Sequence, residues 1–175
     1  PSILVTMHSI DDPSLAPSGC STLYALEPVP NLDGRVDWTR RRGAVVERLR
    51  GQVPAAGYPV DVVTEPILGD AGDAGRTIAA RLAGSPRDRA VAIVGGGETT
   101  VRVVAGGRGG RSQHLALAAA VALAGKPGIV LAAGTDGIDG RTDAAGACID
   151  GATVARAHAR GLDAVAALAA TDSHA

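Results

Sequence analysis

Aromatic side chains are nearly absent from this sequence, which contains no Phe, one Trp and two Tyr. Aromatic residues bury the most area per side chain, so a core without them has few large groups to pack. Hydrophobic residues nevertheless make up 46% of the chain, largely as Ala and Val. This composition excludes disorder throughout and predicts a soluble globular protein of marginal stability.

Cysteine, long apolar runs and excess charge are also scarce. The only cysteines, Cys20 and Cys148, show no metal-ligand spacing, so we expect them to be reduced and buried in a cytoplasmic protein. The longest apolar run, Leu115 to Ala124, is too short to cross a bilayer, which predicts no membrane insertion. A net charge of −1 gives no reason to expect a nucleic-acid partner. Because the chain starts with Pro1 rather than Met, we expect it to be an excised or incomplete piece.

What the sequence does contain is an alternation of strand-like and helix-like segments, which predicts an α/β fold with a layered sheet and flanking helices. Beyond Gly57 the predicted strands are residues 60–64, 90–94, 99–104, 128–133 and 146–149. The predicted helices are residues 70–83, residues 112–124 and two stretches within 153–170. The N-terminal part reads as an α+β arm of two short strands, 3–7 and 22–26, and one helix capped by Asp37.

The common nucleotide-binding motifs are missing. No stretch fits GxxxxGK[ST], because the only lysine, Lys126, precedes a proline. Residues 107–112 narrowly miss GxGxxG, and no acid follows at the expected distance. These absences exclude conventional P-loop and Rossmann sites.

Three polar loops follow predicted strands, which is where α/β sheets bind ligands. The first loop, GGGETT at residues 95–100, holds Glu98 at a strand end after glycines that let the backbone approach a ligand. The alternative interpretation is a hairpin turn with an exposed glutamate.

The second loop, residues 106–114, is glycine-rich and leads into a helix. Free N–H groups at a helix start, together with Arg108 and Arg111, predict an anion site for phosphate or carboxylate. The alternative is a flexible linker in which Ser112 is an ordinary N-cap. His114 reads as a packed or surface histidine rather than a ligand.

The third loop, residues 134–143, is acidic. Its carboxylates could hold Mg²⁺ or accept hydrogen bonds from substrate hydroxyls, with Asp136 and Asp139 the candidate metal ligands. Turn chemistry alone would also explain the Asp-Gly pairs, and the spacing of an EF-hand is absent.

The ordered segments GGGETTVRV, GGRGGRSQHLALAAAVAL, VLAAGTDGIDGRTDAAGA and ATDSHA resemble the C-terminal (MOFRL) domain of type II glycerate 2-kinases over residues 66–175. In that family two α/β domains enclose a cleft in which ATP and Mg²⁺ phosphorylate the 2-hydroxyl of D-glycerate. The resemblance implies that Arg111, Glu98 and Asp136 are catalytic. The residues that it implies for binding substrate or phosphate are Gly96, Gly97, Thr99, Arg108, Gly109, Gly110, Ser112, Thr135 and Asp139.

Two departures from the family pattern accompany this resemblance. Ser112 and His114 stand where the family usually has Asn and Glu. The closing Gly-Pro-Thr-Gly-Thr-Asn motif and the N-terminal kinase domain, with its catalytic lysine, are missing. We therefore expect a truncated domain over residues 61–175 that does not turn over by itself.

The segment before that domain, residues 1–60, resembles a fragment of bacterial phytoene desaturases through its DDPSLAP and LEPVPNL elements. Those enzymes use FAD in carotenoid synthesis, but this chain has no GxGxxG, so FAD is not expected. The resulting expectation is a chimera. The alternatives are a desaturase fragment or a non-catalytic interaction module.

Overall fold

The computed structural model describes residues 4–6, 24–26, 47, 51, 53, 59–85, 90–104 and 106–174. The predicted helix after Asp37 lies outside these residues except for Glu47 and Gly51, which are helical. Cys20 also lies outside them. The chain divides into two compact units, one formed by residues 1–66 and 85–97 and the other by residues 67–84 and 98–175.

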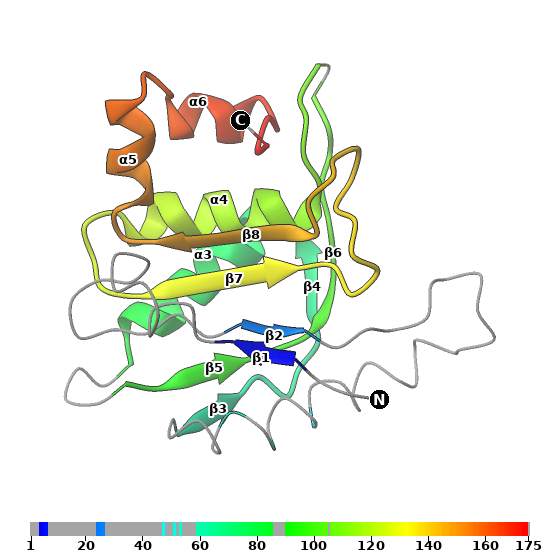
Figure 1. The fold of residues 1–175 in the computed structure, drawn as a ribbon, viewed down its shortest axis with the longest axis vertical. Helices are drawn as coiled ribbons and strands as arrows, with labels where there is room; N and C mark the ends of the chain where they lie inside the picture. Colours follow the sequence, from blue (N-terminus) through cyan, green and yellow to red (C-terminus); the bar gives the residue numbers. More distant parts are fainter. Residues whose placement is uncertain are drawn as a thin grey trace. The chain divides into compact units, whose positions relative to one another are not determined.

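The described residues of the first unit include two pairs of short strands (Figure 1). Strands β1 (Leu4–Thr6) and β2 (Tyr24–Leu26) pair antiparallel, and both lie within the strands predicted from the sequence. Strands β3 (Val60–Val62) and β5 (Ala92–Val94) pair in parallel, with Val60 opposite Ala92.

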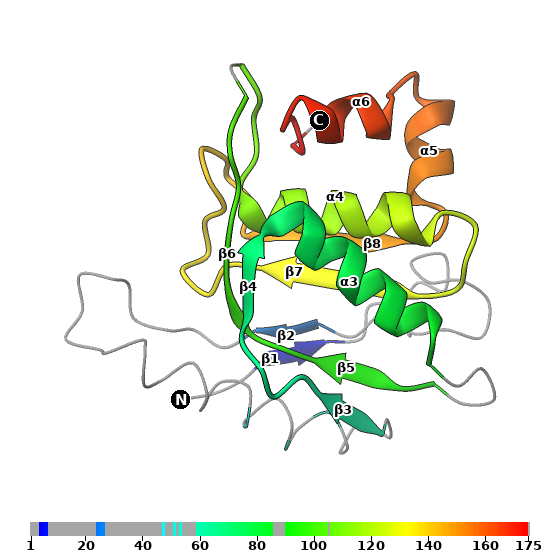
Figure 2. The ribbon, with the colours of Figure 1, turned by 180° about the vertical axis from the view of Figure 1, so that it is seen from behind.

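The second unit begins with β4 (Ile67–Asp70) and α3 (Ala71–Ala83). Next come β6 (Gly97–Thr100), which pairs with β4, and α4 (Arg111–Leu123). Strands β7 (Ile129–Ala133) and β8 (Gly146–Asp150) form an antiparallel pair. The short helices α5 (Thr153–Ala159) and α6 (Ala164–Ala169) complete the unit. Helices α3 and α4 lie side by side on one face of the β7–β8 pair (Figures 1 and 2).

The core of this unit is built from small side chains, as the composition predicts. Alanines of α3 and α4 pack with Leu115, Val130 and Ile149, and Leu123 is the largest side chain that is completely buried among the described residues. Gly75 allows α3 to approach α4 closely, since a Cβ added there would lie 2.2 Å from the backbone oxygen of Leu115. Each small residue contributes little buried area, so close helix contact takes the place of large side chains.

The predicted α/β class is confirmed, and the bounds of both long helices agree with the sequence prediction to one residue. Asp70 caps α3 by accepting a hydrogen bond from the N–H of Asp73 at 3.0 Å. Sequence reasoning missed β4 and placed β6 too late, at residues 99–104. The hairpin interpretation of residues 95–100 is wrong, because β5 pairs with β3 and β6 pairs with β4.

Two further expectations concern the burial of Cys148 and the length of the apolar helices. Cys148 is exposed rather than buried, because it lies on the opposite face of β8 from the buried Ile149. No helix in the described part of the chain is long and apolar enough to cross a membrane.

Candidate active site

An ion pair joins the first and second predicted loops. Arg111 is the first residue of α4, and its Nη1 lies 3.0 Å from Oε1 of Glu98 on β6. Both side chains are substantially exposed, at 46% for Arg111 and 69% for Glu98. An exposed pair of this kind contributes only about 0–1 kcal/mol to stability. Both groups are therefore accessible to a ligand while they hold each other in place.

The start of α4 is capped from a distant loop. The Oδ1 of Asp139 accepts a hydrogen bond from the N–H of Ser112 at 2.9 Å, and its Oδ2 accepts one from the N–H of Gln113 at 2.7 Å. Asp139 is only 3% exposed. A negative charge at this position also interacts favourably with the helix dipole. The N-cap residue is Gly110, which has no side chain to cap the helix, so Ser112 is not the N-cap.

The glycine-rich loop is shaped by neighbours that approach its backbone. A Cβ on Gly110 would lie 2.4 Å from the carboxylate carbon of Asp139, and a Cβ on Gly109, where φ is +134°, would lie 2.2 Å from Oγ of Ser173. Glycine is thus needed at both positions for packing within the chain. The N–H groups and glycines that the sequence assigned to an external phosphate are used here by an internal carboxylate.

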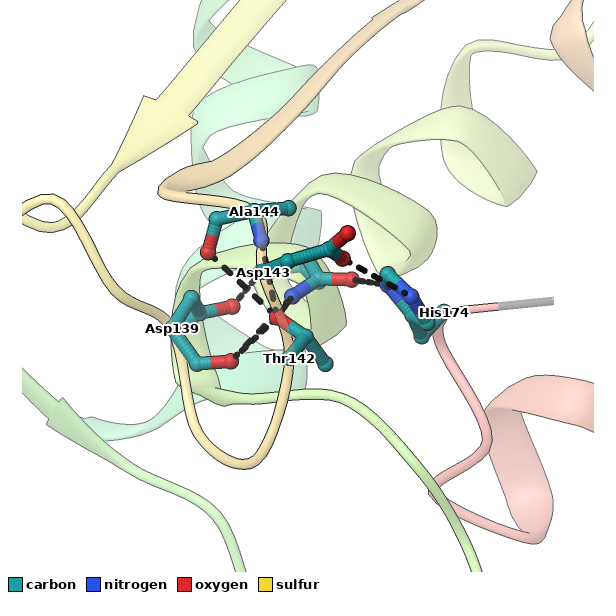
Figure 3. A network of polar contacts seen from close by, with 6 residues as sticks. Asp139, Thr142, Asp143, Ala144 and His174 are labelled. Atoms are coloured by element: carbon teal, nitrogen blue, oxygen red, sulfur yellow. Dashed lines mark hydrogen bonds and ion pairs between the residues drawn. The ribbon is translucent and has the colours of Figure 1, made fainter.

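A buried polar network extends this cap toward the C-terminal segment (Figure 3). Nε2 of Gln113 donates to Oγ1 of Thr142 at 2.9 Å and to the backbone oxygen of Asp139 at 3.3 Å. The hydroxyl of Thr142 donates to the same Asp139 oxygen at 2.8 Å. Nδ1 of His174 lies 2.8 Å from Oε1 of Gln113. Satisfied buried polar groups of this kind fix one arrangement of their loops.

The segment after α6 also holds the glycine-rich loop directly. The N–H of Val104 donates to Oγ1 of Thr171, and the N–H of Arg108 donates to Oδ1 of Asp172, both at 2.9 Å. The N–H of His174 donates to the backbone oxygen of Arg108 at 3.1 Å. Sequence reasoning did not assign Gln113, Thr142 or His174 to the site. The ATDSHA segment was the available signal, because it shares the resemblance with the loops it contacts.

The acidic loop divides its carboxylates between structure and solvent. Asp136 is exposed, and its Oδ1 accepts a long hydrogen bond, 3.4 Å, from the N–H of Ile138. Both carboxylate oxygens of Asp139 are engaged with α4. Within the described residues no group of three or more His, Cys, Asp or Glu side chains could hold a metal ion. Mg²⁺ in kinases is commonly held by one or two carboxylates together with substrate phosphates, a role that the exposed Asp136 fits.

The other predicted residues lie in different settings. Arg108 and Thr135 are exposed, whereas Thr99 is only 7% exposed and points to the opposite face of β6 from Glu98. Gly96 belongs to the first compact unit and Gly97 begins β6. Glu98 and Arg111 are thus the predicted catalytic residues that the structure brings into contact.

His114 is packed, which is one of the two settings, packed or surface, that the sequence predicts. It is 8% exposed, and its Nδ1 has no hydrogen-bond partner among the described residues. Burial lowers the pKa of His114, and the positive charge of Arg76 lowers it further against the opposing effect of Asp70. The imidazole is consequently neutral at neutral pH.

Comparison with known proteins identifies this architecture. Residues 91–175 match the MOFRL family. The D-glycerate 2-kinase of Thermotoga maritima is 39% identical over 136 residues, which cover 74% of this chain and 33% of that protein. The glycerate 2-kinase of Pyrococcus horikoshii is 35% identical, over 67% of this chain and 28% of that protein.

A solved structure gives the same result. The crystal structure of Thermotoga maritima glycerate kinase matches with a TM-score of 0.69 and 38% identity, covering 76% of this chain and 34% of that one. This chain spans about a third of the length of the relatives it matches. Residues 91–175 are therefore a MOFRL domain, homologous to glycerate 2-kinases.

Proposed function

We propose that this chain forms part of a kinase that transfers a phosphoryl group from ATP to the 2-hydroxyl of D-glycerate. The observation that carries the proposal is the exposed Glu98–Arg111 pair, held at the start of α4 in a domain homologous to glycerate 2-kinases. In the reaction the hydroxyl oxygen bonds to the γ-phosphorus and loses its proton to the solvent, the bond from that phosphorus to the β–γ bridging oxygen breaks with its electron pair staying on that oxygen, and ADP leaves.

Each exposed residue has a role in this proposal. The Arg111 guanidinium uses one nitrogen for Glu98 and keeps further N–H groups for an anionic oxygen of the substrate or of the transferring phosphoryl group. Glu98 accepts a hydrogen bond from the substrate hydroxyl and orients it. Asp136 would hold Mg²⁺ together with nucleotide phosphates, and bound ATP supplies the phosphoryl group.

Arg108 in the glycine-rich loop and Thr135 in the acidic loop are exposed, and they are proposed to contact phosphate or carboxylate oxygens. Gly96 and Gly97 are proposed to let a ligand approach the backbone beside Glu98. Gly109, Gly110, Ser112, Asp139 and Thr99 are packed within the chain or bonded to it, and their proposed contribution is to shape the site.

We propose that the chain alone is inactive, because it spans about a third of its glycerate 2-kinase relatives. The test is to replace the matching stretch of the Thermotoga maritima enzyme with residues 67–175 of this chain and to assay phosphorylation of D-glycerate. We expect an active graft, loss of activity in Arg111→Ala, and no product from the isolated chain. A folded but inactive graft contradicts the proposed activity, and product from the isolated chain contradicts the proposed inactivity.

The N-terminal part is proposed to be a desaturase-like segment, so that the chain is a chimera. We further propose that the chain is located in the cytoplasm and binds no FAD. Because the sequence has no dinucleotide fingerprint, the purified full-length chain should show no flavin absorbance. Flavin that co-purifies in stoichiometric amount would instead favour the desaturase reading. If the segment were a non-catalytic interaction module, a graft made with residues 1–175 would be as active as the graft made with residues 67–175.

A further inference from the structure

His174 connects three parts of the candidate site (Figure 3). Its backbone N–H donates to the Arg108 oxygen in the glycine-rich loop. Its Nδ1 lies 2.8 Å from Oε1 of Gln113 on α4, and its Nε2 lies 3.6 Å from Oδ1 of Asp143 in the acidic loop. The side chain is 23% exposed, whereas Asp143 is 95% exposed. The contact with Gln113 is therefore the more sheltered of the two ring contacts.

The direction of the His174–Gln113 hydrogen bond follows from the partners of Gln113. The amide nitrogen of Gln113 donates to Thr142 Oγ1 and to the Asp139 oxygen. Oε1 is consequently the atom that faces His174, and an amide oxygen can only accept. The proton of a neutral His174 must then be on Nδ1.

This hydrogen bond lies next to the start of α4, because Gln113 contacts both His174 and Asp139. By holding Oε1 of Gln113, the imidazole directs the Gln113 amide group toward the turn formed by residues 139–142. That turn presents the Asp139 carboxylate to the N–H groups of Ser112 and Gln113. Arg111 immediately precedes these two residues and carries the ion pair with Glu98. A displacement at Gln113 is thus transmitted to the guanidinium.

We infer that His174 is a positioning residue for Arg111, acting through Gln113 and the Asp139 cap. Its importance for catalysis rests on the proposed function, but the placement itself is a property of this chain. Removing the imidazole leaves the buried Oε1 of Gln113 without its donor, which is the costly way to lose a hydrogen bond. Asparagine at position 174 offers an amide N–H at a similar distance from the backbone and should replace Nδ1 in part.

The first test uses NMR on the ¹⁵N-labelled full-length chain. The ring nitrogen shifts of neutral His174 should report the Nδ1–H tautomer. In His174→Ala the backbone N–H groups of Ser112 and Gln113 should exchange about tenfold faster with solvent. His174→Asn should restore slower exchange, and His158→Ala, at an exposed position on α5, should have no effect. An Nε2–H tautomer, or unchanged exchange in His174→Ala, overturns the inference.

The second test uses the active graft described above. His174→Ala should lower kcat about tenfold with little change in KM, and His174→Asn should recover part of the loss. If His174→Ala is as active as the parent graft, the inference that His174 positions Arg111 for catalysis is overturned. A parent graft that is folded but inactive contradicts the proposed function, whereas the tautomer and exchange measurements still decide the position of His174.

Discussion

At the scale of single residues, one carboxylate determines how the glycine-rich loop is used. A glycine-rich loop before a helix commonly leaves its N–H groups to a bound anion. In this chain Asp139 supplies that anion from a separate loop, 26 residues beyond Gln113. The ligand-binding role is one that we propose for Arg111 instead, because its side chain lies outside the cap. A local sequence pattern could not reveal this arrangement, because the cap exists only after the two loops meet.

Substitution of Asp139 should reveal the strength of the cap. We expect Asp139→Ala to lower the free energy of unfolding by about 2–3 kcal/mol, because two N–H groups at the helix start lose their acceptor. Asp136→Ala, in the same loop but exposed, should stay within about 0.5 kcal/mol of the parent. Urea unfolding measures both values. Equal losses in the two variants would show that Asp139 is not the cap of α4.

The buried His114 should make stability depend on pH. Burial lowers its pKa in the folded chain, so below the ordinary value of 6.5 the unfolded chain binds a proton that the folded chain does not. The free energy of unfolding should therefore be constant above about pH 7 and fall as the pH decreases below 6.5. The measurement is urea unfolding at several pH values.

The matched control for this pH effect is His114→Gln, which cannot titrate in this range and should flatten the profile. His158→Gln changes an exposed histidine and should keep the slope of the parent. If the parent and His114→Gln lose stability in parallel, another group is responsible.

At the scale of elements, the sequence predicted correctly the helices whose bounds are determined by local interactions. The bounds of α3 and α4 follow from a capping aspartate or a glycine-rich start and from long runs of helix-forming residues. Strands β4 and β6 form by pairing with each other, although about 30 residues separate them in the chain. The Thr100 hydroxyl of β6, for example, donates a hydrogen bond to the Gly69 oxygen of β4 at 3.3 Å. Such pairing leaves little local signal in segments that contain Gly69 and Gly97.

The contact between α3 and α4 gives a test at this scale. A Cβ at Gly75 would meet the backbone oxygen of Leu115, whereas a Cβ at Gly72 would first meet the Asp70 side chain at 3.0 Å. Both substitutions to alanine gain helix propensity of about 1 kcal/mol. We expect Gly75→Ala to destabilise the chain by about 1–3 kcal/mol despite this gain, because the helices must separate. Gly72→Ala should stay within about 0.5 kcal/mol of the parent, because the Asp70 Oδ1 that must shift also caps α3, and the weaker cap offsets the gain in helix propensity. Thermal and urea unfolding measure both variants. If both gain stability, the close approach of α3 to α4 at Gly75 is contradicted.

At the scale of the whole molecule, the division into two compact units makes a prediction about how stability is shared. The Asp139 network, α3, α4 and the β7–β8 pair all belong to the second unit. Loss of the cap should therefore raise the rate of amide exchange in peptides from residues 67–84 and 98–174. Peptides from residues 59–66 and 90–97, in the first unit, should exchange as in the parent.

Hydrogen exchange followed by mass spectrometry on Asp139→Ala measures both sets of peptides in one experiment, with Asp136→Ala as the control. A local opening of the second unit changes only the amides that it exposes, so the two sets of peptides separate if the units have their own stability. Faster exchange in both sets would mean that the chain opens as one cooperative body. In that case the Asp139 cap would support the β3–β5 pair as well as the start of α4.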